Sequence, residues 1–421
     1  MDNKEIEQLI TEMAAKGRAA ARKLAALSTS VKNDILLTTA EQLKADRDFI
    51  RTENEKDLVA GREKGLSPAM LDRLELSDKV IASMIQGLEE IAALPDPVGE
   101  VDDMKRRPSG ITVGRMRVPL GVVGMIYESR PNVTIDAAAL CMKAGNGVLL
   151  RGGSEAIHSN LALAGLLQKV LESHNVPKEV VQVIPVTDRY GVNAMLAQEE
   201  FVDVIIPRGG EGLIRFVTEN SSIPVLKHYK GVCHLYIDES GDIDTGVRIA
   251  MNGKTQRPGV CNALEGMLVH KDIAERFLPA AAKELIGAGV ELLGCEQSCA
   301  LVPEIQPATD SDWGTEFLEL KMVVKVVDDM DGAMAYIAQH GSQHTEVIVT
   351  ESYQNSQRFL REVDASAVMI NASSRFNDGG QFGLGAEIGI STTKLHAYGP
   401  MGLEELTTKK FVVYGAGEVR Q

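Results

Sequence analysis

One cysteine, Cys261, lies in a Pro-Gly turn and follows two cationic residues, Lys254 and Arg257. The thiolate of a cysteine is a strong nucleophile, and nearby cations lower the pKa of a thiol. A turn also exposes the sulfur, whereas a buried helix would hide it. The alternative is a cysteine packed in a hydrophobic core, which is the usual environment of an unbridged cysteine. The local sequence leaves both interpretations open.

Two similar loops could bind a ligand that carries a phosphate. Residues 151–154 read Arg-Gly-Gly-Ser and residues 208–211 read Arg-Gly-Gly-Glu, each between a predicted strand and a predicted helix. Paired glycines let a backbone approach a ligand, and a helix N-terminus attracts phosphate. Arg151 could hold a ribose phosphate through two hydrogen bonds. The alternative is an ordinary loop with a serine cap, but two such loops at the ends of neighbouring strands favour ligand binding.

Four other polar residues could take part in chemistry. Asn132 begins a predicted helix, where its amide could donate to a developing oxyanion or cap the first turn. Glu316 lies in a loop just after Trp313 and is otherwise an ordinary charged residue. His340 and His344 flank a Gly-Ser-Gln segment and could line a cleft, with surface-loop histidines as the alternative.

Composition excludes several classes of protein. A chain of 421 residues exceeds one ordinary core and predicts two or three domains. A net charge of −15 without a basic stripe argues against nucleic acid. The five cysteines make no disulfide framework, and Cys295 and Cys299 lack a second pair of ligands, so no metal site is expected. The charged N-terminus and the absence of a long apolar run predict a cytoplasmic protein that enters no membrane.

The hydrophobic pattern predicts helices first and alternating strands and helices afterwards. Residues 3–94 read as helices, two of them capped by Ser67 and Ser77. Residues 111–118 predict a strand paired with residues near 101–106. A parallel sheet covered on both faces follows. Its predicted strands are 122–126, 147–150, 181–186 and 202–206, and its predicted helices begin near 131, 154, 190 and 211.

A second α/β series begins near residue 236. Its predicted strands are 265–270, 289–293, 319–327, 345–350 and 366–371, and its predicted helices are 242–252, 272–287, 328–340 and 353–363. A last strand is predicted at 410–414. Because an isolated terminal strand must find a partner, a neighbouring subunit could supply one.

Together these motifs resemble the aldehyde dehydrogenase superfamily. The matching stretches are 119–134, 143–155, 256–265 and 379–389, in the order of the family and spread over essentially the whole chain. The most similar branch reduces L-glutamyl 5-phosphate to L-glutamate 5-semialdehyde and phosphate with NADPH, in proline biosynthesis. The resemblance implies an α/β fold with two parallel-sheet domains and a small β oligomerisation element.

The resemblance also implies domain bounds and residue roles. Residues 1–101 and 119–235 would bind the nicotinamide cofactor, 236–403 would form the catalytic domain, and 102–118 with 404–421 would supply the oligomerisation strands. Cys261 would be the nucleophile, with Asn132 and the backbone N–H of Cys261 as the oxyanion hole. The cofactor-binding residues would be Arg151, Gly152, Gly153, Ser154, Arg208, Gly209 and Glu316, the last on the nicotinamide ribose.

The substrate's charged groups need partners as well. Lys254 or Arg257 could steady the leaving phosphate, and Glu128, Arg130 and Arg375 are candidates for the α-amine and α-carboxylate. A homo-oligomer is expected, and a transient contact with glutamate 5-kinase would suit an unstable acyl phosphate.

One departure from the superfamily bears on the reaction. Hydrolytic members carry a glutamate base upstream of the cysteine, whereas residues 226–231 here read Leu-Lys-His-Tyr-Lys-Gly. Because a base that activates water would hydrolyse a thioester, the missing carboxylate favours exchange of the thioester with phosphate. A CoA-acylating aldehyde dehydrogenase, which also lacks this base, is one alternative. A non-catalytic scaffold of the same fold is the other.

Overall fold

Serine side chains begin three of the five helices that open the chain, in a computed structural model that describes residues 1–420. The hydroxyl groups of Ser28, Ser67 and Ser77 each accept a hydrogen bond from a first-turn amide, which satisfies a donor that the helix start leaves exposed. The caps predicted at Ser67 and Ser77 are confirmed. The helices are α1 (Asn3–Leu24), α2 (Thr29–Ala45), α3 (Arg47–Glu63), α4 (Pro68–Leu74) and α5 (Asp78–Ala93).

The chain divides into two units, and the first contains residues 1–227, 383–389 and the described residues from 401 onward. Its parallel sheet has the order β5-β4-β3-β6. The strands are β3 (Val122–Tyr127), β4 (Gly147–Arg151), β5 (Val181–Val183) and β6 (Val204–Arg208). The helices between and after them are α6 (Val133–Lys143), η1 (Ser154–Ala156), α7 (Ile157–Ser173), η2 (Lys178–Val180), α8 (Tyr190–Leu196) and α9 (Glu211–Asn220).

This strand order creates a topological switch point. From β3 the chain moves through β4 to β5 on one side and then returns to β6 on the other side. The loops that leave β3 and β6 therefore diverge, and open α/β sheets bind ligands outside the strand ends at such a point. The sheet predicted from the apolar runs is confirmed, although β5 is shorter than predicted and β6 lies two residues later than predicted.

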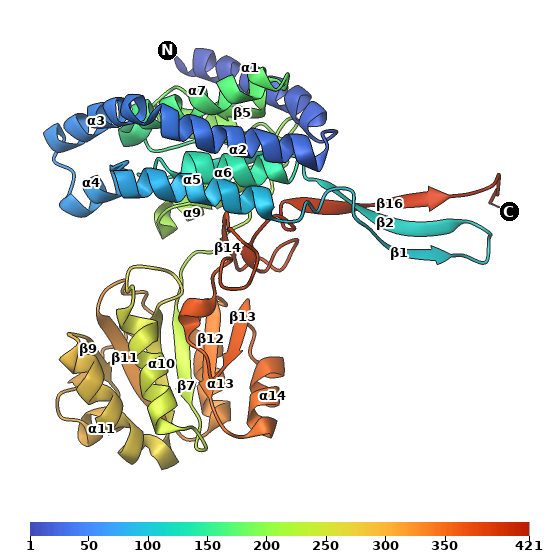
Figure 1. The fold of residues 1–421 in the computed structure, drawn as a ribbon. Coiled ribbons are helices and arrows are strands. Elements are labelled where there is room, and N and C mark those ends of the chain that lie inside the picture. The colour runs from blue at the N-terminus through green and yellow to red at the C-terminus, as the bar shows by residue number, and fades with distance from the viewer. Residues whose placement is uncertain (421) are drawn as a thin grey trace. The chain divides into compact units, whose positions relative to one another are not determined.

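A long antiparallel ribbon belongs to the same unit (Figure 1). It consists of β1 (Val101–Arg106), β2 (Thr112–Pro119) and β16 (Thr407–Tyr414), with β2 in the middle. The last strand needs no neighbouring subunit as the partner of this edge, because β16 pairs with β2 of the same chain from Thr407 to Tyr414. The guanidinium of Arg115 lies 4.5 Å from the ring centre of Phe411, which is its partner residue in this register.

The second unit, residues 228–382 and 390–400, holds a seven-stranded sheet in the order β10-β9-β11-β8-β7-β12-β13. Its strands are β7 (Cys233–Ile237), β8 (Leu264–His270), β9 (Glu291–Gly294), β10 (Gln306–Pro307), β11 (Lys321–Val327), β12 (Thr345–Val349) and β13 (Ala367–Ile370). Its helices are α10 (Ile243–Thr255), α11 (Lys271–Gly287), α12 (Glu296–Leu301), α13 (Met330–His340), α14 (Tyr353–Glu362) and η3 (Ser374–Phe376). All pairings in this sheet are parallel.

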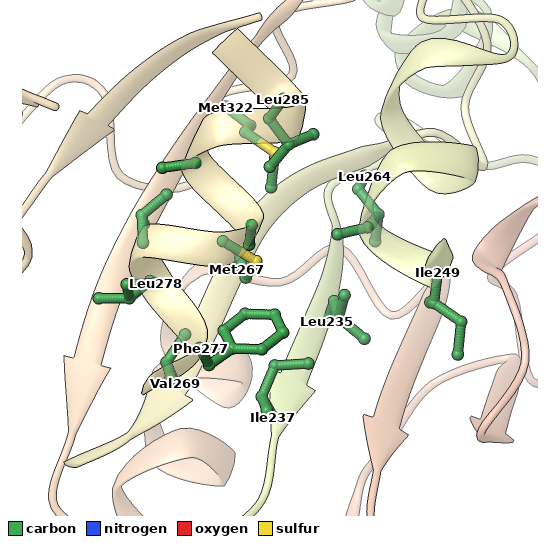
Figure 2. Close-up of a cluster of buried hydrophobic side chains, with 14 of the residues drawn as sticks. Leu235, Ile237, Ile249, Leu264, Met267, Val269, Phe277, Leu278, Leu285 and Met322 are labelled. Carbon is green, nitrogen blue, oxygen red and sulfur yellow. The ribbon is translucent and has the colours of Figure 1, made fainter. Parts of the chain in front are cut away.

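The core of the second unit forms between the sheet and its covering helices. Figure 2 shows Phe277 of α11 pointing toward Leu235 of β7 and Met267 of β8. Full burial of each such side chain contributes about 1.5–3 kcal/mol. Strand β7 crosses the predicted domain boundary between residues 235 and 236, because it pairs with both β8 and β12 and so belongs to this sheet.

Four short elements are not predicted by the sequence pattern. They are α12, β10 and the paired strands β14 (Gly389–Ser391) and β15 (Gly399–Met401). Elements of two or three residues, such as β10, β14 and β15, are too short to display a hydrophobic period. No helix among residues 1–420 is long and apolar enough to span a lipid bilayer.

Candidate active site

Cys261 lies in the turn between α10 and β8 and is partly exposed. The next residue, Asn262, anchors this turn through two hydrogen bonds. Its side-chain amide donates to the backbone carbonyl of Asn377 (3.0 Å), and its backbone carbonyl accepts from the hydroxyl of Ser374 (2.7 Å). The carbonyl of Cys261 accepts a hydrogen bond from the thiol of Cys233 (3.2 Å). Cys233 is fully buried in the core, and this burial raises the pKa of its thiol. Cys261 is not a core cysteine, because it is partly exposed.

A glycine holds the neighbouring segment directly against Cys261. A Cβ atom on Gly231 would lie 1.9 Å from the carbonyl oxygen of Cys261, so no other residue type fits this approach. The N–H of Gly231 donates to a carboxylate oxygen of Glu316 at 2.8 Å. Glu316 therefore orders the segment beside the cysteine, while its predicted contact with the nicotinamide ribose stays a prediction.

Replacing Gly231 with alanine should lower kcat by about 10- to 100-fold, because a displacement of the nucleophile by about 1 Å is that costly. Steady-state kinetics of the purified variant would measure the effect. The matched control is Gly259→Ala in the same loop, since a Cβ there would meet only the carbonyl oxygen of Leu318, at 3.6 Å, among the described atoms. Equal kcat values for the two variants would contradict this role of Gly231.

Two histidines lie beside the sulfur. One ring nitrogen of His228, one of His344 and the Sγ of Cys261 all lie within 4.8 Å of one another. The two imidazole rings meet edge to face with 5.5 Å between their centres. His344 is fully buried, and burial followed by the charge of His228 lowers its pKa to about 3, so it is neutral near pH 7. The surface-loop alternative is therefore wrong for His344.

Sheet topology explains why the sequence did not reveal this cluster. His228 precedes β7, Cys261 precedes β8 and His344 precedes β12, and these three strands are adjacent and parallel. The amino ends of adjacent parallel strands lie at one edge of a sheet, so the three residues meet there. The signal available in the sequence was their shared position just before apolar strands, which needs the strand order to become useful.

Two arginines make the surroundings of Cys261 cationic. Arg257 is exposed, and Arg375 is half-buried with its Nε donating to Gln256 at 2.8 Å. The pKa of Arg375 is lowered, first by burial and then by the positive charge of Arg257, while the negative charges of Asp378 and a Cys261 thiolate act in the opposite direction. An anion bound here would relieve the repulsion between the two guanidinium groups. This placement suits the substrate-binding prediction for both arginines.

Lys254 does not suit that prediction. Its ammonium group is fully buried and lies 2.7 Å from the carboxylate of Glu265 on β8. Burial lowers the pKa of Lys254 and raises the pKa of Glu265 to about 7, because both groups lose hydration. Lys254 therefore joins α10 to β8 inside the second unit, and its predicted contact with the substrate phosphate is not supported by this placement.

In the first unit, the loop after β4 turns its arginine inward. The guanidinium of Arg151 is buried and donates to the backbone carbonyls of Gly152 and Thr187, the latter at 3.2 Å. Burial lowers the pKa of this guanidinium. These contacts do not fit the prediction that Arg151 holds a ribose phosphate through two hydrogen bonds, because N–H groups of its guanidinium already donate to the loop backbone.

The two glycines of this loop make room for protein side chains. A Cβ on Gly152 would lie 2.2 Å from the amide nitrogen of Asn160, and one on Gly153 would lie 2.1 Å from the carboxylate of Glu155. Ser154 is exposed and begins η1. Ser154 is thus the residue of this loop that lies open to a ligand.

The loop after β6 lies at the same edge of the sheet. Strand register pairs Ile126 of β3 with Arg151 of β4 and Tyr127 of β3 with Arg208 of β6. The two glycine loops therefore flank β3, and they do not follow neighbouring strands as predicted.

Gly209 and Gly210 of the second loop are exposed at the start of α9. The carboxylate of Glu128 accepts from the N–H of Gly210 at 3.2 Å, so this predicted substrate residue orders the loop. Arg130, also predicted to bind substrate, is exposed in the loop after β3.

Asn132 is the N-cap residue of α6, yet within the described part of the chain its side chain makes no capping hydrogen bond. The capping alternative is therefore wrong. Its amide instead donates to the carboxylate of Asp136 at 2.9 Å. Burial raises the pKa of Asp136 to about 6, against the opposing effects of Asn132 and Arg208.

The Asp136 carboxyl predicts a pH-dependent stability. Its pKa in the folded state, about 6, is higher than the ordinary value of 3.8, so the folded protein binds more protons between these values and loses stability as pH rises through them. Urea unfolding should show that the free energy of unfolding of the wild type falls by about 1–2 kcal/mol more than that of Asp136→Asn between pH 5 and pH 8. Parallel pH profiles for the two proteins would contradict the raised pKa.

Comparisons with known proteins give one consistent result. Residues 3–291 match a family model described as the aldehyde dehydrogenase family. The chain is 61% identical over 415 residues to gamma-glutamyl phosphate reductase of Desulfotalea psychrophila, with 99% of both chains covered. It is 59% identical to the same enzyme of Geotalea daltonii, over 99% of this chain and 100% of that one. The crystal structure of gamma-glutamyl phosphate reductase from Thermotoga maritima matches with a TM-score of 0.96 and 47% identity, over 98% of this chain and 100% of that one.

Proposed function

Since this chain belongs to the aldehyde dehydrogenase family, we propose that it reduces L-glutamyl 5-phosphate to L-glutamate 5-semialdehyde and phosphate, with NADPH as the electron donor. The family and its fold, as inferred from four sequence motifs, are confirmed. The observation that carries the proposal is the fixed, partly exposed turn of Cys261 beside two arginines. The high identity to gamma-glutamyl phosphate reductases supports the substrate.

The first step is attack on the acyl phosphate by the Cys261 thiolate. The sulfur bonds to the carbonyl carbon, the carbonyl oxygen becomes an oxyanion, and collapse of this adduct expels phosphate and leaves a thioester. Arg375 favours the thiolate, because its charge interacts with that of Cys261. Arg257 and Arg375 together would stabilise the negative charge of the leaving phosphate. The amide of Asn132 and the N–H of Cys261 stay the predicted donors to the oxyanion.

The segment beside the sulfur bears on what happens to the thioester. Residues 226–231 contain no carboxylate, so the base that hydrolytic members use is missing. His344, with a pKa of about 3, is too weak a base to activate water near pH 7. Both features favour a thioester that survives until it is reduced.

The first unit has features that fit a dinucleotide. The switch point of the sheet, the exposed Ser154 and the exposed glycines at the start of α9 leave backbone N–H groups and a helix N-terminus for phosphate. Arg208 is half-buried at this edge and remains the cationic candidate in place of Arg151. When bound, NADPH would supply the hydride that converts the thioester to a thiohemiacetal, which then releases the aldehyde and regenerates the thiolate.

Partners and location follow as proposals. We place the reaction in the cytoplasm, in a homo-oligomer that associates through the β1-β2-β16 ribbon, whose β1 strand is exposed at all six residues. A transient contact with glutamate 5-kinase would deliver the unstable acyl phosphate.

The reverse reaction tests the proposed function. Purified protein is mixed with L-glutamate 5-semialdehyde and NADP⁺ or NAD⁺, and reduced nicotinamide is followed by absorbance with phosphate, with CoA or with neither. Sustained turnover that needs phosphate and prefers NADP⁺ is expected. Turnover that needs CoA would indicate the CoA-acylating alternative, and no turnover under any condition would indicate the non-catalytic scaffold.

A further inference from the structure

The cluster of Cys261, His228 and His344 has the composition of a metal site. Thiolate and imidazole are the ligands that Zn²⁺ prefers, and three protein ligands leave the fourth tetrahedral position open. One potential ligand atom from each residue already lies within 4.8 Å of the other two. Zinc needs N and S atoms at about 2.0–2.3 Å, so the three groups must close by about an ångström around the ion.

Each imidazole is prepared for metal binding by its hydrogen bonds. Nδ1 of His228 lies 2.8 Å from the carbonyl of Ile390, so it donates its proton there and leaves Nε2 as the basic nitrogen. Metal-bound histidines commonly donate their other ring nitrogen to a backbone carbonyl in this way. The backbone contact also fixes the orientation of the ring.

His344 provides the second, independent observation. It has no solvent exposure, and its Nδ1 lies 2.8 Å from the hydroxyl of Thr345. Its Nε2 is buried with no hydrogen-bond partner among residues 1–420. A buried polar atom without a partner is destabilising, and a bound cation would satisfy it.

We propose that Cys261, His228 and His344 bind a borderline or soft divalent cation, of which Zn²⁺ is the type, and that this cation blocks the nucleophile reversibly. Binding forms a bond between Sγ and the metal, and the thiol proton leaves to solvent. The thiolate is the form of cysteine that binds metal, which is why this proton must leave. The inhibition rests on the proposed role of Cys261, whereas the metal binding does not.

Cobalt(II) reports directly on this site. The chelator-treated full chain is titrated with Co²⁺. Binding should saturate at one equivalent of Co²⁺ and should produce a thiolate-to-cobalt charge-transfer band together with the intense visible bands of a four-coordinate ion. Cys261→Ala should abolish the charge-transfer band. His228→Gln, at a half-buried position, should weaken Co²⁺ binding by at least about 10-fold. Co²⁺ binding without a thiolate band, or with the same affinity in His228→Gln, would overturn the proposal.

Zn²⁺ itself should protect Cys261 from alkylation and should inhibit turnover. In the wild type, Zn²⁺ should slow alkylation of Cys261 by iodoacetamide and stop turnover, and a chelator should restore both. The matched control is Asp272→Asn, which removes an exposed carboxylate from the second cluster of potential ligands, Glu239, His270 and Asp272, and should respond to Zn²⁺ as the wild type does. Alkylation of Cys261 at an unchanged rate under saturating Zn²⁺ would overturn the proposal, whether or not the protein is a reductase.

Discussion

Cys261→Ala should abolish reduction of NADP⁺ by the semialdehyde while leaving NADPH binding within about twofold of the wild type. The sulfur is the only group proposed to bond to the substrate, and loss of such a nucleophile removes most of the rate enhancement, on the order of 10⁶-fold in well-studied hydrolases. The cofactor is expected to bind through the first unit, whereas Cys261 belongs to the second. Enzyme assays and a fluorescence titration with NADPH would measure the two effects.

The neighbouring thiol supplies the control for this experiment. Cys233 donates to the carbonyl of Cys261 and is fully buried, so Cys233→Ala should reduce turnover only modestly, by loosening the turn. A Cys261→Ala protein that retains more than about 1% of wild-type turnover would contradict covalent catalysis by this residue. Equal losses in the two alanine variants, with both proteins folded, would indicate that the turn and not the sulfur matters.

Asn132→Ala should lower kcat by about 10²–10³-fold, the effect expected when one donor to an oxyanion is removed. The loss should appear in kcat and in kcat/KM to a similar degree, because the interaction is stronger in the transition state than with bound substrate. Asn132 makes no capping hydrogen bond within the described residues, so the loss should not come from an unfolded α6. Steady-state kinetics with both substrates varied would measure it.

Two further variants distinguish the effect of the Asn132 amide from the effect of its hydrogen-bond partner, Asp136. Asn132→Asp keeps the size of the side chain but replaces the donor with an acceptor, so it should be as inactive as the alanine variant. Asp136→Asn removes the charge to which Asn132 donates and should keep most of the activity. An effect of Asn132→Ala confined to KM would contradict its predicted role.

Local signals in the sequence predicted much of the fold. Ser67 followed by Pro68 marked the start of α4, and the pattern from Glu211 to Asn220 gave the bounds of α9. These elements are decided by caps and by hydrophobic period, which short windows of sequence contain. The pairing of β16 with β2 is not contained in such local signals, because the two strands lie almost 300 positions apart, and only the resemblance to the family placed both in one element.

The partly exposed turn of Cys261 was predicted, because it follows from that residue and its neighbours in the sequence. The site was missed where burial decides the role of a charged group. Lys254 lies on the inner face of α10 with Ile249, Ala250 and Gly253, a helical spacing that could have indicated a buried lysine in need of a partner. Arg151 gave no such signal, since the direction of its side chain depends on the carbonyls of a distant loop.

A burst experiment without phosphate tests the covalent role of Cys261 most directly. With semialdehyde and NADP⁺ alone, the wild type should form one NADPH per active site in a rapid burst and then stop, because the thioester has no acceptor. Mass spectrometry of the quenched protein should find the glutamyl group on the peptide that contains Cys261, and added phosphate should restart turnover. The absence of a burst, or a glutamyl group on any other residue, would contradict the account.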